Sequence, residues 1–457
     1  MKTPKNGLYL RTEDFEQWSE IMTECINAEE KIQTGTIKYS KIRHKNITFV
    51  VTENCNLNCT YCYEKHKTNK RMTKEVAKQA VDFILNDNLV NGYYDINKCN
   101  SVILDFIGGE PLLEIDIIDY IVEYFKYKSF QLNHPWATNY KISITSNGTL
   151  YNTDKVQNFL KRNTGKVDLS ITIDGNKELH DKCRIFPDGS GSYDIVEQAI
   201  KKQIKDGCNQ ETKITLCPSN VMYLNDALKN VWSLGIQGAY TNCVFEKGWT
   251  IDDAKILYTE MIKLADYLLE DKNYAKYYCS LFNENIGGQL KDRTNWCGGN
   301  GDMLAIGTDG KCYPCIRFMK YSLATPGRKE QSIGDIWNGL DSKKNNPWLL
   351  KLSKVDMITQ CQHDDNKKCL TCPISDGCAL CTAYNYDYYG DPNHKATFIC
   401  DTHKARILAN IYYWNKLYVK LDINKTFKCN IPKEWASEII SEEEYIYLLN
   451  LSKRGDQ

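Results

Sequence analysis

The sequence predicts an α/β fold in which a parallel sheet carries helices on its outer side, followed by a second, cysteine-rich domain. From about residue 46 to 235, strand-like and helix-like patterns alternate, which is typical of parallel strands joined by helices. Twelve of the 20 cysteines of this 457-residue chain also lie in two fields, at 55–62 and 297–400. A chain of this length is expected to divide into two or three domains, and the second field marks the later one.

The elements expected in the first domain follow one another in regular order. The strand-like runs are short and apolar, and they cover 47–51, 101–107, 141–145, 167–173 and 212–216. The helix-like runs between them cover 73–86, 114–128, 153–162 and 192–205. Because parallel α/β sheets bind their ligands at the carboxyl ends of the strands, motifs at those ends are the candidate site.

The remaining segments are assigned by their patterns. A helical pattern at about 12–32 makes the N-terminal segment a packing element, and a helix at about 251–270 is the clearest feature of a bridging region. A further helix is expected at about 402–421. The expected division of the chain is 1–45 (N-terminal packing element), 46–235 (barrel), 236–296 (bridging region), 297–404 (cysteine-rich domain) and 405–457 (C-terminal helix and tail).

Composition excludes several classes of protein. Apolar residues make up 42% of the chain, and 58 basic residues balance 58 acidic ones, which argues against a dedicated nucleic-acid binder. The start of the chain shows no secretory signal, and no apolar run is long enough to span a membrane, so a cytoplasmic location without membrane partners is expected. In that compartment, clustered cysteines are expected to bind metal rather than to form disulfides.

The first cysteine field is a loop that follows a strand. Cys55, Cys59 and Cys62 have the spacing C-x3-C-x2-C. Three thiolates on such a loop can hold three irons of a [4Fe–4S] cube and leave the fourth iron open to a small molecule. The alternative is a zinc loop with His66 as a fourth ligand.

Other polar motifs follow the later strands. Gly108-Gly109-Glu110-Pro111 combines two glycines, which let a backbone approach a ligand closely, with a carboxylate. Ser146-Asn147-Gly148 and Thr172-Ile173-Asp174 end the next two strands, and the first of these is also a common turn sequence. Arg184 suits a carboxylate ligand, although a surface ion pair is equally open for it, and Leu216 can face a ligand or the core.

The cysteine loop, with Tyr61 just before the third cysteine, and the later Gly-Gly-Glu-Pro resemble the radical S-adenosylmethionine (SAM) enzymes. This resemblance implies a partial (β/α)6 TIM-like barrel and a cluster whose open iron binds SAM. It implies contacts to the SAM amino group from Glu110 and its neighbours, and to the ribose or carboxylate from the later motifs. The residues implied in SAM binding are Tyr61, Gly108, Gly109, Glu110, Pro111, Ser146, Asn147, Thr172, Arg184 and Leu216.

The second cysteine field resembles the SPASM extension of peptide-modifying members, which carries two auxiliary [4Fe–4S] clusters. The resemblance implies three clusters in all. The distal auxiliary cluster would be held by Cys369, Cys372, Cys378 and Cys400. The nearer one would use Cys297, Cys315 and Cys381, with Cys312, Cys279 or no residue of this chain as the fourth ligand.

This field departs from the SPASM pattern at one point. Two residues separate Cys378 from Cys381, where the family has three, so the role of Cys381 is open. One or two structural zinc sites are the alternative for the whole field. The isolated cysteines are expected to be small buried hydrophobes, and they are Cys25, Cys99, Cys183, Cys208, Cys217, Cys243 and Cys429.

The resemblance implies a peptide maturase that abstracts hydrogen and forms a crosslink, with a cysteine thioether favoured by the abundance of thiols. Its expected partners are a cysteine-containing precursor peptide, a separate leader-binding protein, because 1–45 is too short for an ordinary binding domain, and flavodoxin or ferredoxin as electron donor. One alternative is an anaerobic sulfatase-maturating enzyme that generates formylglycine. An alternative of another class is a non-catalytic zinc or iron–sulfur scaffold.

Overall fold

The computed structural model describes most of the chain. The described residues are 44–95, 99–207, 211–289, 297–300, 303–342, 346–355, 369–378, 380–428 and 431–453. The helix expected at 12–32 lies outside these residues. So does the N-terminal packing element, except for residues 44 and 45. Cys25, Cys208 and Cys429 also lie outside them.

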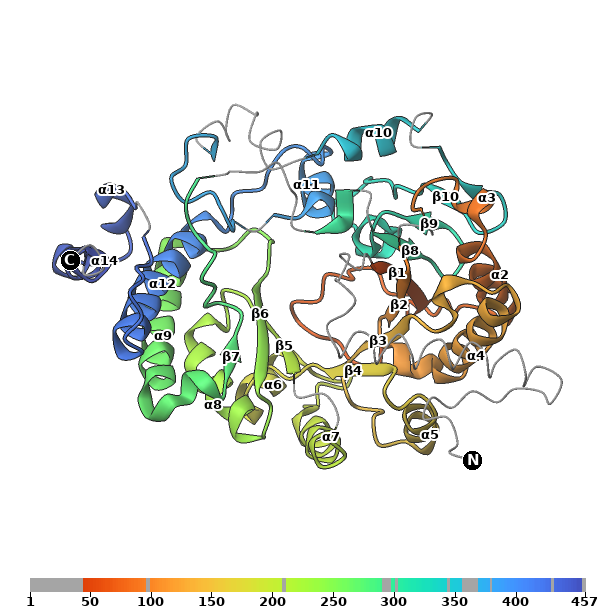
Figure 1. Ribbon diagram of the computed structural model, residues 1–457, viewed down its shortest axis with the longest axis horizontal. Helices are drawn as coiled ribbons and strands as arrows, with labels where there is room; N and C mark the ends of the chain where they lie inside the picture. Colours follow the sequence, from red (N-terminus) through yellow and green to blue (C-terminus); the bar gives the residue numbers. More distant parts are fainter. Residues whose placement is uncertain are drawn as a thin grey trace, which may run out of the picture.

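Six strands form the wall of an open barrel (Figure 1). They are β1 (His44–Thr52), β2 (Ser101–Gly108), β3 (Tyr140–Ser146), β4 (Val167–Ile171), β5 (Glu211–Leu216) and β6 (Gly238–Cys243). The pairs from β1 to β4 are parallel, as is the pair β5 and β6. A side chain joins the two groups of strands, because the Thr212 hydroxyl donates to the Ile171 carbonyl at 2.6 Å. The predicted α/β partial barrel is confirmed.

Helices cover the outer side of this wall (Figure 1). The longer ones are α2 (Lys74–Ile84), α4 (Ile115–Gln131), α5 (Asp154–Arg162), α7 (Tyr193–Lys205), α8 (Leu224–Ser233) and α9 (Ile251–Leu269). Short helical segments are α3 (Asp87–Val90), α6 (Lys177–Cys183), η2 (Pro111–Glu114), η3 (Pro135–Ala137), η4 (Val221–Tyr223) and η5 (Glu270–Ala275). Alternate residues of the strands, such as Ile47, Phe49 and Val51, are fully buried against the helices.

The opposite face of the sheet, inside the barrel, is polar. The hydroxyls of Thr48 on β1 and Ser143 on β3 both donate to the carboxylate of Asp105 on β2, at 3.0 and 2.8 Å. A polar interior suits a polar ligand, because buried polar groups need hydrogen-bonding partners.

The sixth strand lies in the segment that we expected to be a bridge. β6 pairs with β5, and β7 (Tyr278–Cys279) pairs with β6. The sequence of β6, Gly-Ala-Tyr-Thr-Asn-Cys, has no run of β-branched apolar residues, which explains why no strand was predicted there. The barrel strands therefore continue beyond residue 235.

The cysteine-rich region contains short elements packed on the open side of the barrel (Figure 1). Its strands are β8 (Leu304–Ile306), β9 (Cys312–Tyr313), β10 (Gly334–Asp335) and β11 (Gly339–Leu340). Its helical segments are η6 (Gly298–Asn300), η7 (Ile316–Phe318), η8 (Lys320–Ser322), α10 (Pro347–Ser353) and α11 (Thr382–Tyr389). β8 pairs in parallel with β1, so this region extends the barrel sheet.

The C-terminal part packs against the last barrel helix. It contains α12 (Cys400–Lys420), α13 (Lys433–Ala436) and α14 (Glu442–Lys453). α12 runs alongside α9 and begins at one of the predicted metal ligands, so it connects the cysteine-rich region to the barrel (Figure 1). No helix in the described part of the chain is long and apolar enough to cross a membrane.

Candidate functional site

The carboxyl ends of the barrel strands surround a cavity of about 350 Å³. Most of the predicted SAM-site residues line it, and these are Cys55, Cys59, Tyr61, Cys62, Gly108, Gly109, Glu110, Ser146, Asn147, Thr172 and Arg184. Residues from distant parts of the sequence therefore meet at the edge of the sheet where parallel α/β folds bind their ligands.

Two predicted residues do not line the cavity. Pro111 is buried at the start of η2, where its fixed φ suits the first helical position. Leu216 is 1% exposed and packs in the apolar core behind the sheet. Of the two alternatives left open for Leu216, this placement agrees with the core position, because neighbouring strand residues face opposite sides and Thr215 lines the cavity instead.

Gly108 and Gly109 let two chain segments approach each other. A Cβ atom on Gly108 would lie 2.3 Å from the Thr52 carbonyl oxygen, and one on Gly109 would lie 2.3 Å from that of Asn54. The Gly109 Cβ would also lie 2.8 Å from the Cβ of Cys55. The glycines are thus required where the cysteine loop crosses the end of β2, in addition to lining the cavity.

Glu110 connects two turns at the cavity wall. Its buried carboxylate accepts hydrogen bonds from Leu112 N at 3.0 Å, Ser146 Oγ at 2.8 Å and Asn147 N at 2.7 Å. Burial raises the pKa of Glu110, while these three donors act in the opposite direction. A carboxylate offers about four acceptor sites, so Glu110 retains one for a ligand.

The side chain of Asn147 fastens the cysteine loop to the turn after β3. Its Nδ2 donates to Asn56 Oδ1 at 2.8 Å, and Asn56 Nδ2 donates in turn to Thr149 Oγ1 at 2.8 Å. The Thr149 backbone N–H donates to Asn147 Oδ1 at 3.0 Å. This network fixes the loop that carries Cys55 and explains why an amide follows the predicted serine.

Arg184 reaches the cavity from the end of α6. Its Nη1 donates to the Tyr61 hydroxyl at 2.8 Å, and that hydroxyl donates to Asp174 Oδ2. Arg184 is 7% exposed, and its Nε has no hydrogen-bond partner in the described part of the chain. A buried cation with an unused donor beside a cavity fits an anionic ligand group, so Arg184 is not a surface ion pair.

A buried histidine holds the backbone of Arg184 in place. His180 Nδ1 accepts from the Asp174 N–H at 3.3 Å, so its Nε2 carries the proton and donates to Ser192 Oγ at 2.9 Å. The Ser192 hydroxyl then donates to the Arg184 carbonyl at 2.7 Å. Burial lowers the pKa of His180 to about 3, which keeps it neutral. No sequence motif marks His180 or Ser192, because their spacing matches none.

The three thiols of the loop and the two charged groups fit a cluster that binds an amino acid. Cys55, Cys59 and Cys62 line the cavity, and Glu110 and Arg184 are suited to an ammonium and a carboxylate. His66, the fourth ligand of the zinc alternative, lines a different cavity with Glu53 and Lys311. This donor set favours an iron–sulfur cube with one open iron over zinc.

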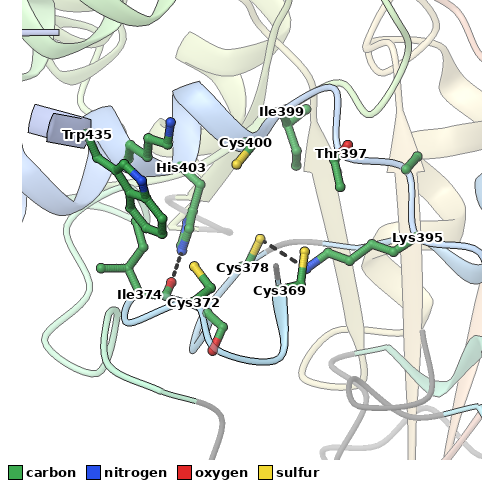
Figure 2. A pocket seen from close by; sticks show the side chains of 13 residues that line it. Cys369, Cys372, Ile374, Cys378, Lys395, Thr397, Ile399, Cys400, His403 and Trp435 are labelled. Carbon is green, nitrogen blue, oxygen red and sulfur yellow. Dashed lines mark hydrogen bonds between the residues drawn. The ribbon is translucent and has the colours of Figure 1, made fainter. Parts of the chain in front are cut away.

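A second group of thiols converges in the cysteine-rich region (Figure 2). Cys369, Cys372, Cys378 and Cys400 line one small cavity, which Ile374, His403 and Trp435 help to enclose. Lys395 Nζ donates to Cys378 Sγ at 3.4 Å. His403 Nε2 donates to the Ile374 carbonyl at 2.9 Å and is therefore already occupied.

The arrangement of these thiols bears on the kind of metal. In the described part of the chain, no three His, Cys, Asp or Glu side chains gather closely enough to hold a single metal ion. The four thiols instead surround a space (Figure 2). Zinc draws its ligands to about 2.3 Å from one point, whereas a cube occupies a volume between them. The arrangement fits a [4Fe–4S] cluster.

Three further thiols form the nearer group. Cys297, Cys315 and Cys381 interact electrostatically with one another. A Cβ atom on Gly299 would lie 3.4 Å from Cys297 Sγ and 4.0 Å from Cys315 Cβ, so the loop passes closely around this group. Cys381 joins it despite its shifted spacing. We call these three residues the nearer trio.

Neither candidate for a fourth ligand joins the nearer trio. Cys312 is fully buried in the apolar core, and its thiol donates to the Gly310 carbonyl at 4.0 Å. Strand alternation is the reason, because Tyr313, the next residue of β9, packs in a separate apolar cluster. Cys279 is also in the core, with its thiol 3.8 Å from Thr241 Oγ1. The prediction of Cys312 as a metal ligand is not supported by this placement.

The isolated cysteines differ in their surroundings. Cys183 and Cys217 are buried, as expected, and Cys99 is partly exposed. Cys243, at the end of β6, is half-buried: it packs against the apolar core and also lines the cavity together with Asn242 and Phe245.

Comparison with known proteins agrees with this geometry. Residues 49–218 match the radical SAM superfamily, and residues 297–373 match the SPASM iron–sulfur cluster-binding domain. The chain is a radical SAM enzyme with a SPASM domain. These two domains imply SAM and [4Fe–4S] clusters as its cofactors.

Several relatives of this radical SAM enzyme are similar over most of its length. The antilisterial bacteriocin subtilosin biosynthesis protein AlbA of Bacillus subtilis is 23% identical over 388 residues, covering 81% of this chain and 76% of AlbA. A cysteine-type anaerobic sulfatase-maturating enzyme of Clostridium perfringens is 24% identical over 383 residues, covering 77% and 91%. The structure of native anSMEcpe with bound AdoMet and a Kp18Cys peptide has a TM-score of 0.60 at 19% identity, covering 84% of this chain and all of that one. This last similarity shows a common fold.

Proposed function

We propose that this radical SAM enzyme is a peptide maturase that forms a cysteine thioether in a ribosomally made peptide. The observation that carries the proposal is the nearer trio, in which three thiols come together and, in the described part of the chain, neither Cys279 nor Cys312 completes the set. A cluster held by three protein thiolates has an iron free for the thiolate of a substrate cysteine. A thiolate bound to a metal is deprotonated and fixed in place.

The residues of the cavity would orient the reaction. SAM bound to the first cluster supplies one-electron abstraction of hydrogen from carbon. Glu110 and Arg184 would hold its ammonium and carboxylate, and Tyr61 would keep Arg184 in position. Forming the carbon–sulfur bond removes one hydrogen atom from carbon and one proton from the thiol, so the product is lighter by two hydrogens. The remaining electron is taken up by the enzyme.

The cofactors and partners follow from the same proposal. The loop of Cys55, the nearer trio and the four thiols of Figure 2 would hold three [4Fe–4S] clusters, or about 12 irons per chain. Substrate would be a cysteine-containing precursor peptide, delivered by a separate leader-binding protein. Flavodoxin or ferredoxin would supply the electrons.

Formylglycine formation is the second candidate, favoured by the sulfatase-maturating relative that this chain covers to 91%. The test incubates the reconstituted enzyme anaerobically with SAM, reductant and cysteine-containing peptides. A thioether gives a mass loss of two hydrogens and one fewer alkylatable thiol. Formylglycine instead loses the sulfur and gives an aldehyde that hydrazide reagents capture.

Two outcomes of these measurements would contradict the proposed function. If the purified protein contains zinc and about four irons or fewer, and forms no 5′-deoxyadenosine, the maturase proposal is wrong and a scaffold role replaces it. If 5′-deoxyadenosine forms but peptide thiols remain alkylatable and no aldehyde appears, the thioether and the formylglycine products are both excluded.

A further inference from the structure

The positively charged side chain of Arg317 lies in the cavity wall between the first cysteine loop and the nearer trio. The side chain of Arg317, from η7, lines the same cavity as Cys62. Its Nη2 lies 2.6 Å from Glu246 Oε1, and this carboxylate also lines the cavity. The guanidinium carbon lies 5.3 Å from the ring centre of Tyr63 and 5.7 Å from that of Tyr384. Two rings and one carboxylate therefore fix its position.

Tyr63, Arg317 and Tyr384 are each joined to a predicted cluster ligand. Tyr63 directly follows Cys62 in the sequence. The backbone N–H of Arg317 donates to Cys315 Sγ at 3.3 Å, and that of Tyr384 donates to Cys381 Sγ at 3.4 Å. Tyr63, Arg317 and Tyr384 thus form a continuous wall from the first thiol set to the nearer trio.

The positive charge of Arg317 acts on two thiols of the nearer trio. The guanidinium interacts electrostatically with the thiols of Cys315 and Cys381 and pairs with Glu246. The cations that act on the thiols of the first loop are others, because Lys67 acts on Cys55, and Arg184 acts on Cys59. Each thiol set therefore has its own nearby cation.

We propose that Arg317 is a positioning residue whose cation raises the reduction potential of the cluster at the nearer trio, and that Glu246 moderates this effect. Reduction adds a negative charge to a cluster, and a nearby cation stabilises the reduced form. Net charge and hydrogen bonds to sulfur are the means by which a protein sets such potentials. The inference rests on the cluster assignment in the proposed function but not on the identity of the product.

The experiment is a redox titration of the reconstituted full-length enzyme, followed by electron paramagnetic resonance. Arg317→Gln should shift one auxiliary midpoint potential to a more negative value, and Arg317→Lys should restore most of it. Glu246→Gln should shift the same potential in the opposite direction. The SAM-cluster potential and the second auxiliary potential should not move in any of these variants.

Arg328 provides a matched control. It also packs over a tyrosine, with its guanidinium 5.3 Å from the ring centre of Tyr386, but it does not line the cavity. Arg328→Gln should leave all three potentials unchanged. Shifts of equal sign in Arg317→Gln and Glu246→Gln would show a structural disturbance and overturn the proposal, as would an equal shift in Arg328→Gln.

Iron content is measured for every variant. If Arg317→Gln fails to take up iron, Glu246→Gln and Arg317→Lys still decide the matter. An auxiliary potential that stays constant or becomes more negative in Glu246→Gln overturns the proposal. The peptide product plays no part in these measurements, so the thioether assignment can fail while Arg317 keeps this role.

Discussion

Glu110→Gln tests the SAM site most sharply, because it changes one charge and almost no volume. In the wild-type chain, Oε1 accepts from Leu112 N and Ser146 Oγ, and Oε2 accepts from Asn147 N at 2.7 Å. A glutamine that keeps the first two bonds places its NH2 against the Asn147 N–H. A buried donor left without an acceptor costs about 1–3 kcal/mol, so the free energy of unfolding should fall by about that amount.

The same change removes the carboxylate expected to hold the SAM ammonium. A hydrogen bond to a charged group contributes about 1.5–3 kcal/mol, and about 1.4 kcal/mol corresponds to a factor of ten. The dissociation constant of SAM should therefore rise by about 10- to 150-fold. Anaerobic calorimetry on the iron-loaded enzyme measures this, and urea denaturation measures the stability.

Glu114→Gln is the matched control for both measurements. Glu114 is the last residue of η2, of which Glu110 is the N-cap, and it pairs at 3.2 Å with Arg71, whose side chain is 63% exposed while that of Glu114 is 13% exposed. Such a pair contributes about 0–1 kcal/mol, and SAM binding should be unaffected. Wild-type SAM affinity in Glu110→Gln would show that Glu110 only connects the two turns, and equal losses in both variants would refute its role in the site.

Three further predictions follow from the site. Replacing Cys55, Cys59 and Cys62 together by Ala should abolish 5′-deoxyadenosine formation and lower iron from about 12 to about 8 per chain, and continued SAM cleavage would contradict the assignment. Cys312→Ala should leave iron content and turnover unchanged, because Cys312 packs in the core, and a loss of about four irons would restore it as a ligand. The neutral His180 should make unfolding pH-dependent: its pKa is about 3 in the folded chain and about 6.5 when unfolded, so the unfolded state binds more protons between these values. The free energy of unfolding should then fall as pH is lowered from 6.5, by up to about 1.4 kcal/mol per pH unit. Denaturation at a series of pH values measures this fall. If His180→Asn shows the same dependence of stability on pH as the wild type, the prediction is contradicted.

Local sequence patterns predicted the barrel strands whose residues alternate clearly or form an apolar run. The expected run at 101–107 is β2 with one added residue, and that at 212–216 is β5 with one added residue. β6 was missed because its sequence, Gly-Ala-Tyr-Thr-Asn-Cys, has no run of β-branched apolar residues. β8 has only three residues and exists through its pairing with β1, far away in the sequence, which no local pattern shows.

For the site, spacing predicted what lies on short loops, and tertiary structure decided the rest. The thiols of Cys55, Cys59 and Cys62 line one cavity because a tight loop carries all three. Leu216 and Cys312 lie in the core rather than beside a ligand, because a displacement of one residue along a strand reverses the direction of a side chain. Neither motif nor spacing marks Arg317 or His180, since the partners of each come from segments that meet only in the folded chain.

The pairing of β8 with β1 has a consequence for any attempt to exchange the SPASM domain between relatives. Leu304, Ala305 and Ile306 cover the edge of the barrel sheet opposite Ile47, Thr48 and Phe49. A chain cut before residue 297 would leave that edge of β1 unpaired and remove Ala305 from its contact with Val50. Exposed apolar strand edges recruit other chains, so the isolated barrel should aggregate. A transplanted SPASM domain must therefore bring along a matching β1, and the unit that can be exchanged is larger than either family boundary suggests.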